Sequence, residues 1–199
     1  AHRLKIPTSM TKAAEHIAAW KEFPCDIGRF NDDYFVYIAA FGLFTDVSYE
    51  TSQDLKNILG HLAYVMEGAK RIFDVKTYHL CVEANGEVHE GDYIYGMITN
   101  SHSVGGFRNL VGNDVEMDDG LFEVTLIKKP KNPLELNEII AALINAYDDT
   151  DMIDAFKADS LYIHGDEAIS WTLDGEFGGE HKEVNIKNRK QALDIFINS

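Results

Sequence analysis

The sequence predicts an α+β fold that is predominantly antiparallel β, in the form of a β-sandwich or barrel with inserted helices. Three observations lead to this prediction. Short apolar or alternating runs recur along most of the chain, as β-strands require. Two connections between such runs, Asn85-Gly86 and Asp174-Gly175, have the composition of tight hairpin turns. Few segments have helical periodicity, and the longest are residues 52–73 and 133–147.

The first half of the chain is expected to begin with a helix and to continue in hairpins. Residues 11–23 form an amphipathic pattern that Pro24 would end, because a proline disfavours helical geometry in the residue before it. Asn31-Asp32-Asp33 is expected to form a turn. The expected strands of this half cover residues 25–30, 34–41, 75–84, 87–89 and 93–99.

The second half continues in the same style. Residues 100–107 form a glycine-rich loop, which is either a long connection or a place where backbone approaches a ligand closely. Residues 133–147 begin with proline, which is favourable in the first turn of a helix, and residues 151–158 are expected to add a second, short helix. The expected strands cover residues 121–129, 161–164, 169–173, 184–186 and 193–197.

The composition is that of an acidic globular protein. The chain has 199 residues, and 45% of them are hydrophobic, which is sufficient for a buried core. A formal net charge of -15 argues against nucleic-acid binding, and against binding to an anionic membrane through broad surface charge. Cys25 and Cys81 are interpreted as buried free thiols of a reducing compartment. No apolar run is long enough to span a membrane and no secretory signal is visible.

One stretch near the C-terminus combines turn residues with chemistry. Asp174 and Glu176 flank Gly175, and Gly178-Gly179 follow. A plain hairpin turn explains the Asp-Gly pair, but it requires neither the second acid nor the extra glycines. Carboxylates beside accessible backbone suit a proton-accepting or metal-holding site. Both interpretations remain open on the local pattern.

A second acidic stretch, residues 116–122, has the same ambiguity. An Asp-Gly turn that leads into a strand explains it structurally. Such a turn can also direct one Asp side chain and two backbone carbonyls at one point, and Mg²⁺ accepts three such oxygens while keeping waters. Asp119 is the side chain that would do this.

Other devices are not recognisable. The sequence contains no GxGxxG, no Walker-type phosphate loop and no G-x-S-x-G. Its eight histidines lack metal-ligand spacing, and the acidic residues at 148–154 lack the spacing and central glycine of a calcium loop. No nucleotide-binding residue is therefore assigned.

The order of these segments resembles the C-terminal portion of the soluble bacterial diacylglycerol kinase family, a group of lipid kinases that includes the sphingosine kinases and, more remotely, the NAD kinases. The stretches that carry the resemblance are Leu4-Lys5-Ile6-Pro7, Asp26-Ile27-Gly28, Tyr34-Phe35-Val36-Tyr37-Ile38-Ala39-Ala40, Val47-Ser48-Tyr49-Glu50-Thr51, residues 100–107, Asp118-Asp119-Gly120-Leu121-Phe122 and Leu173-Asp174-Gly175-Glu176.

The resemblance implies a two-domain enzyme, in which a Gly-Gly-Asp-Gly-Thr loop of an N-terminal domain binds ATP and the second domain is a β-sandwich. That loop is missing here, and the sequence starts at Ala1 without an initiator methionine, so we expect a piece of a longer chain. The implied division is residues 1–26, a linker and helix from the end of the nucleotide domain, residues 27–188, the lipid kinase β-sandwich, and residues 189–199, a segment that returns to the first domain.

The resemblance also implies roles for individual residues. Glu176 corresponds to the proton acceptor and Asp174 to its acidic neighbour, which together form the expected catalytic pair. The side chain of Asp119 and the carbonyls of Glu116 and Leu121 are implied as ligands of a structural Mg²⁺. In a separate position, Asp26 corresponds to an acidic residue near the domain junction. His2 stands where the family has an arginine, which weakens any phosphate contact from that end.

The activity that the resemblance implies is transfer of a phosphoryl group from ATP, with Mg²⁺, to the free hydroxyl of diacylglycerol, which gives phosphatidic acid. The alternatives are another lipid acceptor, such as a sphingoid base or phosphatidylglycerol, or a non-catalytic lipid-binding β-sandwich. We expect this chain alone to be inactive, because the ATP loop is absent. We further expect a cytoplasmic protein with peripheral membrane contact and no nucleic-acid partner, and homodimer formation is left open.

Overall fold

The computed structural model describes residues 9–18, 21–43, 75–101, 116–144 and 150–197. The helix expected at 52–73 and most of the glycine-rich loop at 100–107 lie outside these residues. The described helices are α1 (Met10–Ala18) and α4 (Pro133–Ile144), and the strands are β1 (Lys21–Phe30), β2 (Asp33–Phe35), β3 (Ile38–Gly42), β4 (Tyr78–Ala84), β5 (Glu87–Thr99), β6 (Phe122–Lys128), β7 (Ile153–Ala158), β8 (Ser160–Leu173) and β9 (Glu176–Ile197).

The strands form one sheet that curves back on itself. Along the sheet the order is β2-β1-β9-β8-β3-β5-β6-β7, and β4 pairs with both β5 and β8. Every strand pairing among the described residues is antiparallel. The long strands β5 and β8 each pair with β3 at one end and with β4 at the other, which closes a circuit of four strands. The expectation of a predominantly antiparallel β fold with few helices is confirmed.

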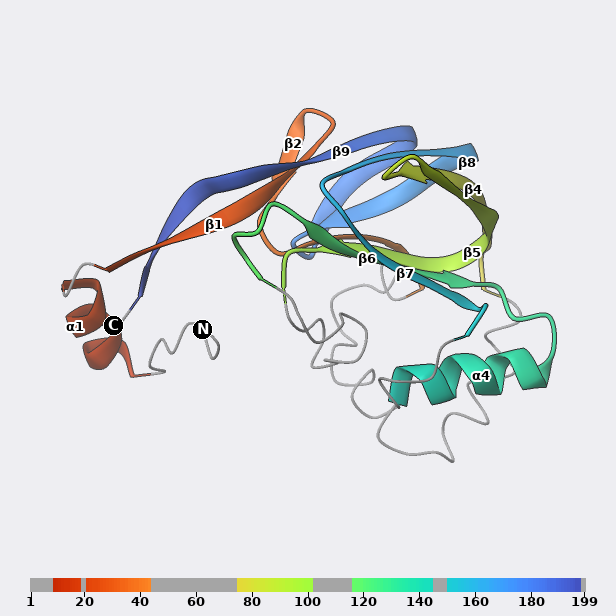
Figure 1. The fold of residues 1–199 in the computed structure, drawn as a ribbon, viewed down its shortest axis with the longest axis horizontal. Helices are drawn as coiled ribbons and strands as arrows, with labels where there is room; N and C mark the ends of the chain where they lie inside the picture. The colour runs from red at the N-terminus through yellow and green to blue at the C-terminus, as the bar shows by residue number, and fades with distance from the viewer. Residues whose placement is uncertain (1–8, 19–20, 44–74, 102–115, 145–149, 198–199) are drawn as a thin grey trace.

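Two apolar cores lie on opposite faces of this sheet. The larger core fills the inside of the curve, where Trp171 packs edge-on against Phe30 and Phe41. The smaller core includes Met97 of β5 and is completed by Ile139 of α4, which lies across the outer face of the sheet (Figure 1). Helix α4 thus shields a strand face that would otherwise expose apolar side chains.

Tight turns join neighbouring strands at the two positions that were predicted from the sequence. Asn85 and Gly86 between β4 and β5 both have positive φ, 55° and 80°. Asp174 and Gly175 between β8 and β9 show the same pattern, 52° and 91°. Positive φ at both central residues is the geometry of the hairpin turn whose twist matches paired strands.

Strands β1 and β9 extend beyond the body of the sheet. Their pairing runs from Phe30↔Ile186 out to Lys21↔Ile197, and α1 lies at the far end of this arm, against β9 (Figure 1). The helix expected at 11–23 is shorter than predicted, because residues from Lys21 onward are recruited into β1. Pro24 lies within that strand, opposite Asp194, instead of ending the helix. Among the described residues β1 has only one partner there, so the missing N–H is tolerated at an edge.

Two further predictions of secondary structure are wrong. Residues 151–158 were expected to be helical, but Ile153–Ala158 form β7, which pairs residue by residue with β6. The strand expected at 34–41 is divided into β2 and β3 by a bend at Val36 and Tyr37. Both errors arise because a partner distant in sequence decides the local conformation. No helix among the described residues is long and apolar enough to cross a bilayer.

Candidate functional site

The β8–β9 turn is fastened to the bend between β2 and β3 by one side chain. The Asp174 carboxylate accepts three backbone hydrogen bonds, from the N–H groups of Val36 (2.7 Å), Tyr37 (2.8 Å) and Ile38 (2.9 Å). The Asp174 N–H in turn donates to the Ile38 carbonyl (2.8 Å). Asp174 therefore replaces the strand pairing that the bend loses, and it fixes where the turn sits. This engagement suits a positioning role.

Glu176, the first residue of β9, is placed differently. It pairs with Leu173 across the turn, and its side chain is exposed. Within the part of the chain that the structure describes, the Glu176 carboxylate has no hydrogen bond or ion pair. Its backbone is held by the hairpin and by the Asp174 anchor. Glu176 is thus a carboxylate in a defined position whose oxygens are available to a bound molecule.

Exposed apolar side chains flank this turn. Phe177, next to Glu176, is 71% exposed, and Tyr37 and Val36 of the bend are 39% and 37% exposed. A single exposed apolar residue is ordinary on a protein surface, but several on segments that meet at one turn indicate a contact surface. The segments that meet at the turn of the candidate base therefore carry exposed apolar side chains.

The acidic loop at residues 116–121 is held by another carboxylate, that of Asp26, which is buried. One oxygen of Asp26 accepts from the Gly120 N–H (2.6 Å) and the other from the Gln191 N–H (2.7 Å). Asp26 lies opposite a bulge of β9, because it alone separates Cys25 from Ile27, whereas three residues separate their partners Leu193 and Arg189. The Asp26 N–H also donates to the Met117 carbonyl (2.8 Å). The acidic residue near the expected domain junction thus joins β1, β9 and the loop.

Within this loop, Asp119 already has protein partners. Its Oδ1 accepts from the Leu121 N–H (2.9 Å), and its Oδ2 lies 3.6 Å from Nζ of Lys157. The carbonyls of Met117, Asp118 and Asp119 accept hydrogen bonds from the chain's own groups. The two carbonyls that were predicted to bind Mg²⁺, those of Glu116 and Leu121, are not among these three. The donor set of one carboxylate and two carbonyls suits a hard cation. In this structure the Asp119 carboxylate contacts Lys157 and the Leu121 N–H instead.

Glu123 was missed by the sequence reasoning. It lies on β6 directly opposite Lys157, with its side chain 7% exposed and Oε1 3.5 Å from the ammonium nitrogen. Burial raises the pKa of Glu123 to about 7, although the nearby Lys157 opposes this shift. Nothing local in the sequence marks an inward-facing acid. Only its place in an otherwise buried strand, residues 122–127, could have shown it.

Asn100 connects the two acidic segments. Its backbone N–H donates to the Tyr37 carbonyl (3.2 Å), at the bend held by Asp174. Its side-chain amide donates to the carbonyls of Asp26 (2.8 Å) and Met117 (3.3 Å). The structure therefore places the 174–176 turn and the 116–121 loop on either side of one buried asparagine. From the sequence, Asn100 was recognised only as the first residue of the glycine-rich loop.

One groove lies away from this region. It measures about 670 Å³ and lies between the Asn85-Gly86 hairpin and the basic side chains of Arg29, Lys187 and Arg189. These elements are at the end of the β8–β9 hairpin opposite to Glu176. The groove is open and mixed in character, so the candidate site rests on the geometry around Glu176.

Comparison with known proteins shows which family the chain resembles. Residues 40–197 match the model described as the YegS C-terminal NAD kinase beta sandwich-like domain. The chain is 32% identical over 194 residues to a diacylglycerol kinase of Staphylococcus carnosus, and 31% identical to that of Staphylococcus aureus. These alignments cover 97% of this chain, but only 62% and 61% of the relatives. The chain thus spans about three fifths of their length.

Solved structures agree on the fold. The crystal structure of a diacylglycerol kinase from Bacillus anthracis strain Sterne has a TM-score of 0.69 at 18% identity, over 99% of this chain and 62% of that one. A second structure from this organism has a TM-score of 0.75 at 21% identity, over 99% and 65%. The resemblance to the C-terminal portion of these kinases is confirmed. The chain belongs to the family of YegS C-terminal NAD kinase beta sandwich-like domains.

Proposed function

We propose that this chain forms the lipid-binding part of an ATP-dependent kinase that phosphorylates the free hydroxyl of diacylglycerol to phosphatidic acid. The observation that carries the proposal is Glu176, an exposed carboxylate held rigidly beside apolar side chains. The names of the relatives at 31–32% identity support the reaction class. The apolar surroundings of Glu176 favour a lipid acceptor.

In the proposed mechanism, Glu176 accepts the proton of the lipid hydroxyl as the hydroxyl oxygen attacks the terminal phosphorus of ATP. The bond from that phosphorus to the bridging oxygen breaks, and ADP leaves with that oxygen. A well-placed general base contributes about 10²–10⁴ in rate. Asp174 would hold the turn so that Glu176 meets the hydroxyl. We therefore propose Asp174 as a positioning residue, whereas the resemblance implied that it forms a catalytic pair with Glu176. Mg²⁺ bound to ATP would neutralise phosphate charge, as in other phosphoryl transfers.

A structural Mg²⁺ at the 116–121 loop is a separate part of the proposal. The Asp119 side chain and the carbonyls of Glu116 and Leu121 would hold it. The Asp119 carboxylate would exchange its contact with Lys157 for the ion. Its role would be to keep the loop in shape, at a distance from the phosphoryl transfer.

The proposed domain arrangement places the body, residues 27–188, on the lipid side. Residues 1–26 and 189–199 would connect it to a nucleotide-binding domain that precedes this chain. The arm formed by β1 and β9 supports this, because it holds both segments together away from the body (Figure 1). ATP bound to that preceding domain would then meet the lipid hydroxyl at Glu176.

Membrane contact would be local. A net charge of -15 repels anionic headgroups, which attract basic segments instead. Phe177, Tyr37 and Val36 offer an apolar contact beside the proposed base. We therefore propose a cytoplasmic protein that touches the bilayer through this edge.

A phosphoryl-transfer assay tests the proposal. The protein that contains this chain together with a preceding nucleotide-binding segment should phosphorylate diacylglycerol in mixed vesicles with ATP and Mg²⁺, and the 199-residue chain alone should not. Sphingosine, phosphatidylglycerol and NAD serve as competing acceptors. If any of these compounds is phosphorylated faster than diacylglycerol, that compound is the substrate instead. Turnover by the chain alone would contradict the assignment of ATP binding to another segment.

A further inference from the structure

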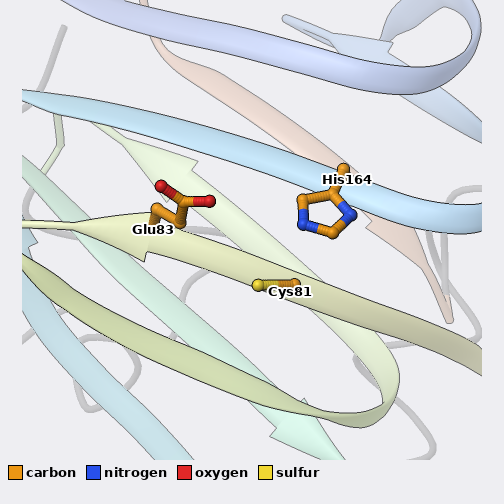
Figure 2. A group of neighbouring side chains, drawn as sticks. All are labelled: Cys81, Glu83 and His164. Carbon is orange, nitrogen blue, oxygen red and sulfur yellow. The ribbon is translucent and has the colours of Figure 1, made fainter.

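A cluster of metal-binding side chains lies on the surface of the sheet, apart from the candidate active site. Cys81 and Glu83 project from β4, and His164 projects from the adjacent strand β8 (Figure 2). The cysteine sulfur, a carboxylate oxygen and a ring nitrogen all lie within 4.8 Å of one another. These three groups share no short sequence spacing, since β4 and β8 are brought together only by the fold.

The strand pairing fixes this arrangement. Cys81 stands directly opposite His164, and Glu83 is two residues along β4, so it projects from the same face. Residues directly opposite each other in antiparallel strands have Cβ atoms about 4.5–5.5 Å apart. The intervening Val82 and its partner Ile163 point into the core and are fully buried. The backbone beneath the three ligand atoms is therefore rigid, whereas the side chains can adjust.

The donor atoms select a particular class of ion. Thiolate, imidazole and carboxylate together suit Zn²⁺, whereas Mg²⁺ and Ca²⁺ prefer oxygen ligands only. Zn²⁺ binds sulfur at about 2.3 Å and nitrogen or oxygen at about 2.0–2.2 Å, so the ligand atoms would close in by small side-chain rotations. Three protein ligands leave the fourth tetrahedral position to water.

Neighbouring acids add favourable charge. Glu90 of β5 stands opposite Cys81, and Glu183 of β9 stands opposite His164. Carboxylates around a site raise the local concentration of cations and can orient the ligands. Both acids come from strands that flank the β4–β8 pair.

We propose that Cys81, Glu83 and His164 bind a zinc-class divalent ion, which fastens β4 to β8 on the outer face of the sheet. The site is independent of the proposed kinase activity, because its ligands are separate from Glu176 and the 116–121 loop. Its test therefore uses metal binding and not turnover.

Co²⁺ is the probe, since its spectrum reports both thiolate ligation and tetrahedral geometry. The chain is stripped with a chelator, kept reduced with a non-thiol reductant and titrated with Co²⁺. We expect one ion per chain, a thiolate-to-cobalt charge-transfer band and intense visible bands, all lost when Zn²⁺ displaces the cobalt. The absence of a saturable band in the parent chain overturns the proposal.

Single substitutions assign the ligands. Cys81→Ser should abolish the charge-transfer band, and His164→Asn or Glu83→Gln should weaken Co²⁺ binding by about 10–100-fold, the range seen when the surroundings of a metal site are changed. The matched controls are Cys25→Ser, the other thiol, and His79→Asn. His79 lies on the same face but contacts Asp92 (3.0 Å) and Glu90 (3.5 Å) instead. Loss of binding in His79→Asn with retention in His164→Asn overturns the proposal.

A second measurement uses the parent chain, so it does not depend on whether a variant folds. Cys81 is partly exposed and Cys25 is buried, so alkylation of the native chain should modify Cys81 first. Stoichiometric Zn²⁺ should slow this modification at least about 10-fold, because a metal-bound thiolate is not available to the reagent. Mass spectrometry identifies the modified cysteine. Equal alkylation rates with and without Zn²⁺ overturn the proposal.

Discussion

The β8–β9 turn and the loop at residues 116–121 both present acids beside a glycine, yet they use them in different ways. In the turn, Asp174 is fully occupied by backbone N–H groups and Glu176 has no partner among the described residues. In the loop, Asp119 carries local hydrogen bonding and an ion pair at once. The turn thus divides structure and chemistry between two side chains, whereas the loop combines them in one. A substitution that removes a whole carboxylate side chain should therefore separate the two functions only in the turn.

Glu176→Gln should have the largest effect on activity and almost none on folding. In the longer protein we expect turnover to fall by about 10²–10⁴-fold, because the variant cannot accept a proton. Unfolding in urea should change by no more than about 0.5 kcal/mol, as for other exposed positions. Glu180→Gln, also exposed on β9, is the matched control and should leave both unchanged. Near-normal turnover in Glu176→Gln would remove this residue from the mechanism.

Asp174→Ala should show the opposite balance. It leaves the N–H groups of Val36, Tyr37 and Ile38 without their acceptor, and we expect a loss of about 1–3 kcal/mol in the free energy of unfolding. Any loss of turnover should accompany that loss of stability, and Asp174→Asn should be intermediate because one acceptor oxygen remains. Urea unfolding measures the change, with the exposed Asp166→Asn on β8 as the control. An unaltered unfolding curve for Asp174→Ala would contradict the anchoring role.

The contrast also explains what could be predicted from the sequence. Asn85-Gly86 and Asp174-Gly175 are local signals, since the turn residues themselves supply the required positive φ, and both hairpins were predicted. The bend at Val36 was not predictable, because the residue that causes it, Asp174, is 138 positions away. Strand β7 was mistaken for a helix for the same reason, as pairing with β6 decides its conformation.

The site shows the same limit. Glu176 could be named from a motif, but the motif could not show that Asp174 is occupied by the β2–β3 bend. In the sequence, Asn100 was notable only as the start of a loop. It links the two acidic segments by donating to three carbonyls, those of Tyr37, Asp26 and Met117, which are distant from it in sequence. Cys81 and His164 meet only because β4 pairs with β8. The acidic residues could therefore be named from local patterns, whereas their contacts could not.

Glu123 makes the stability of the 116–121 region depend on pH. Its pKa is raised from 4.5 to about 7 by burial, so between these values the folded chain holds a proton that the unfolded chain releases. Stability from this group is therefore present below pH 4.5 and is lost as pH rises through about 7. Between pH 5 and 8 this shift corresponds to a loss of about 2–3 kcal/mol. Urea unfolding in chelator at pH 5 and 8 should show that Glu123→Gln lacks this loss, and equal losses in both proteins would refute it.

Mg²⁺ should produce the smallest effect, and it tests whether Asp119 also serves as a ligand. Binding to the folded state alone stabilises by RT ln(1 + [Mg²⁺]/Kd), which is about 1.4 kcal/mol at ten times Kd. For a chain of this size that corresponds to a rise in melting temperature of about 3–6 °C. Asp119→Asn should abolish the rise while keeping an acceptor for the Leu121 N–H, so its melting temperature without Mg²⁺ should stay close to that of the parent. The exposed Asp159→Asn serves as the control. An equal rise in Asp119→Asn would show that the ion binds elsewhere, and Asp119 would then be a structural acid like Asp174.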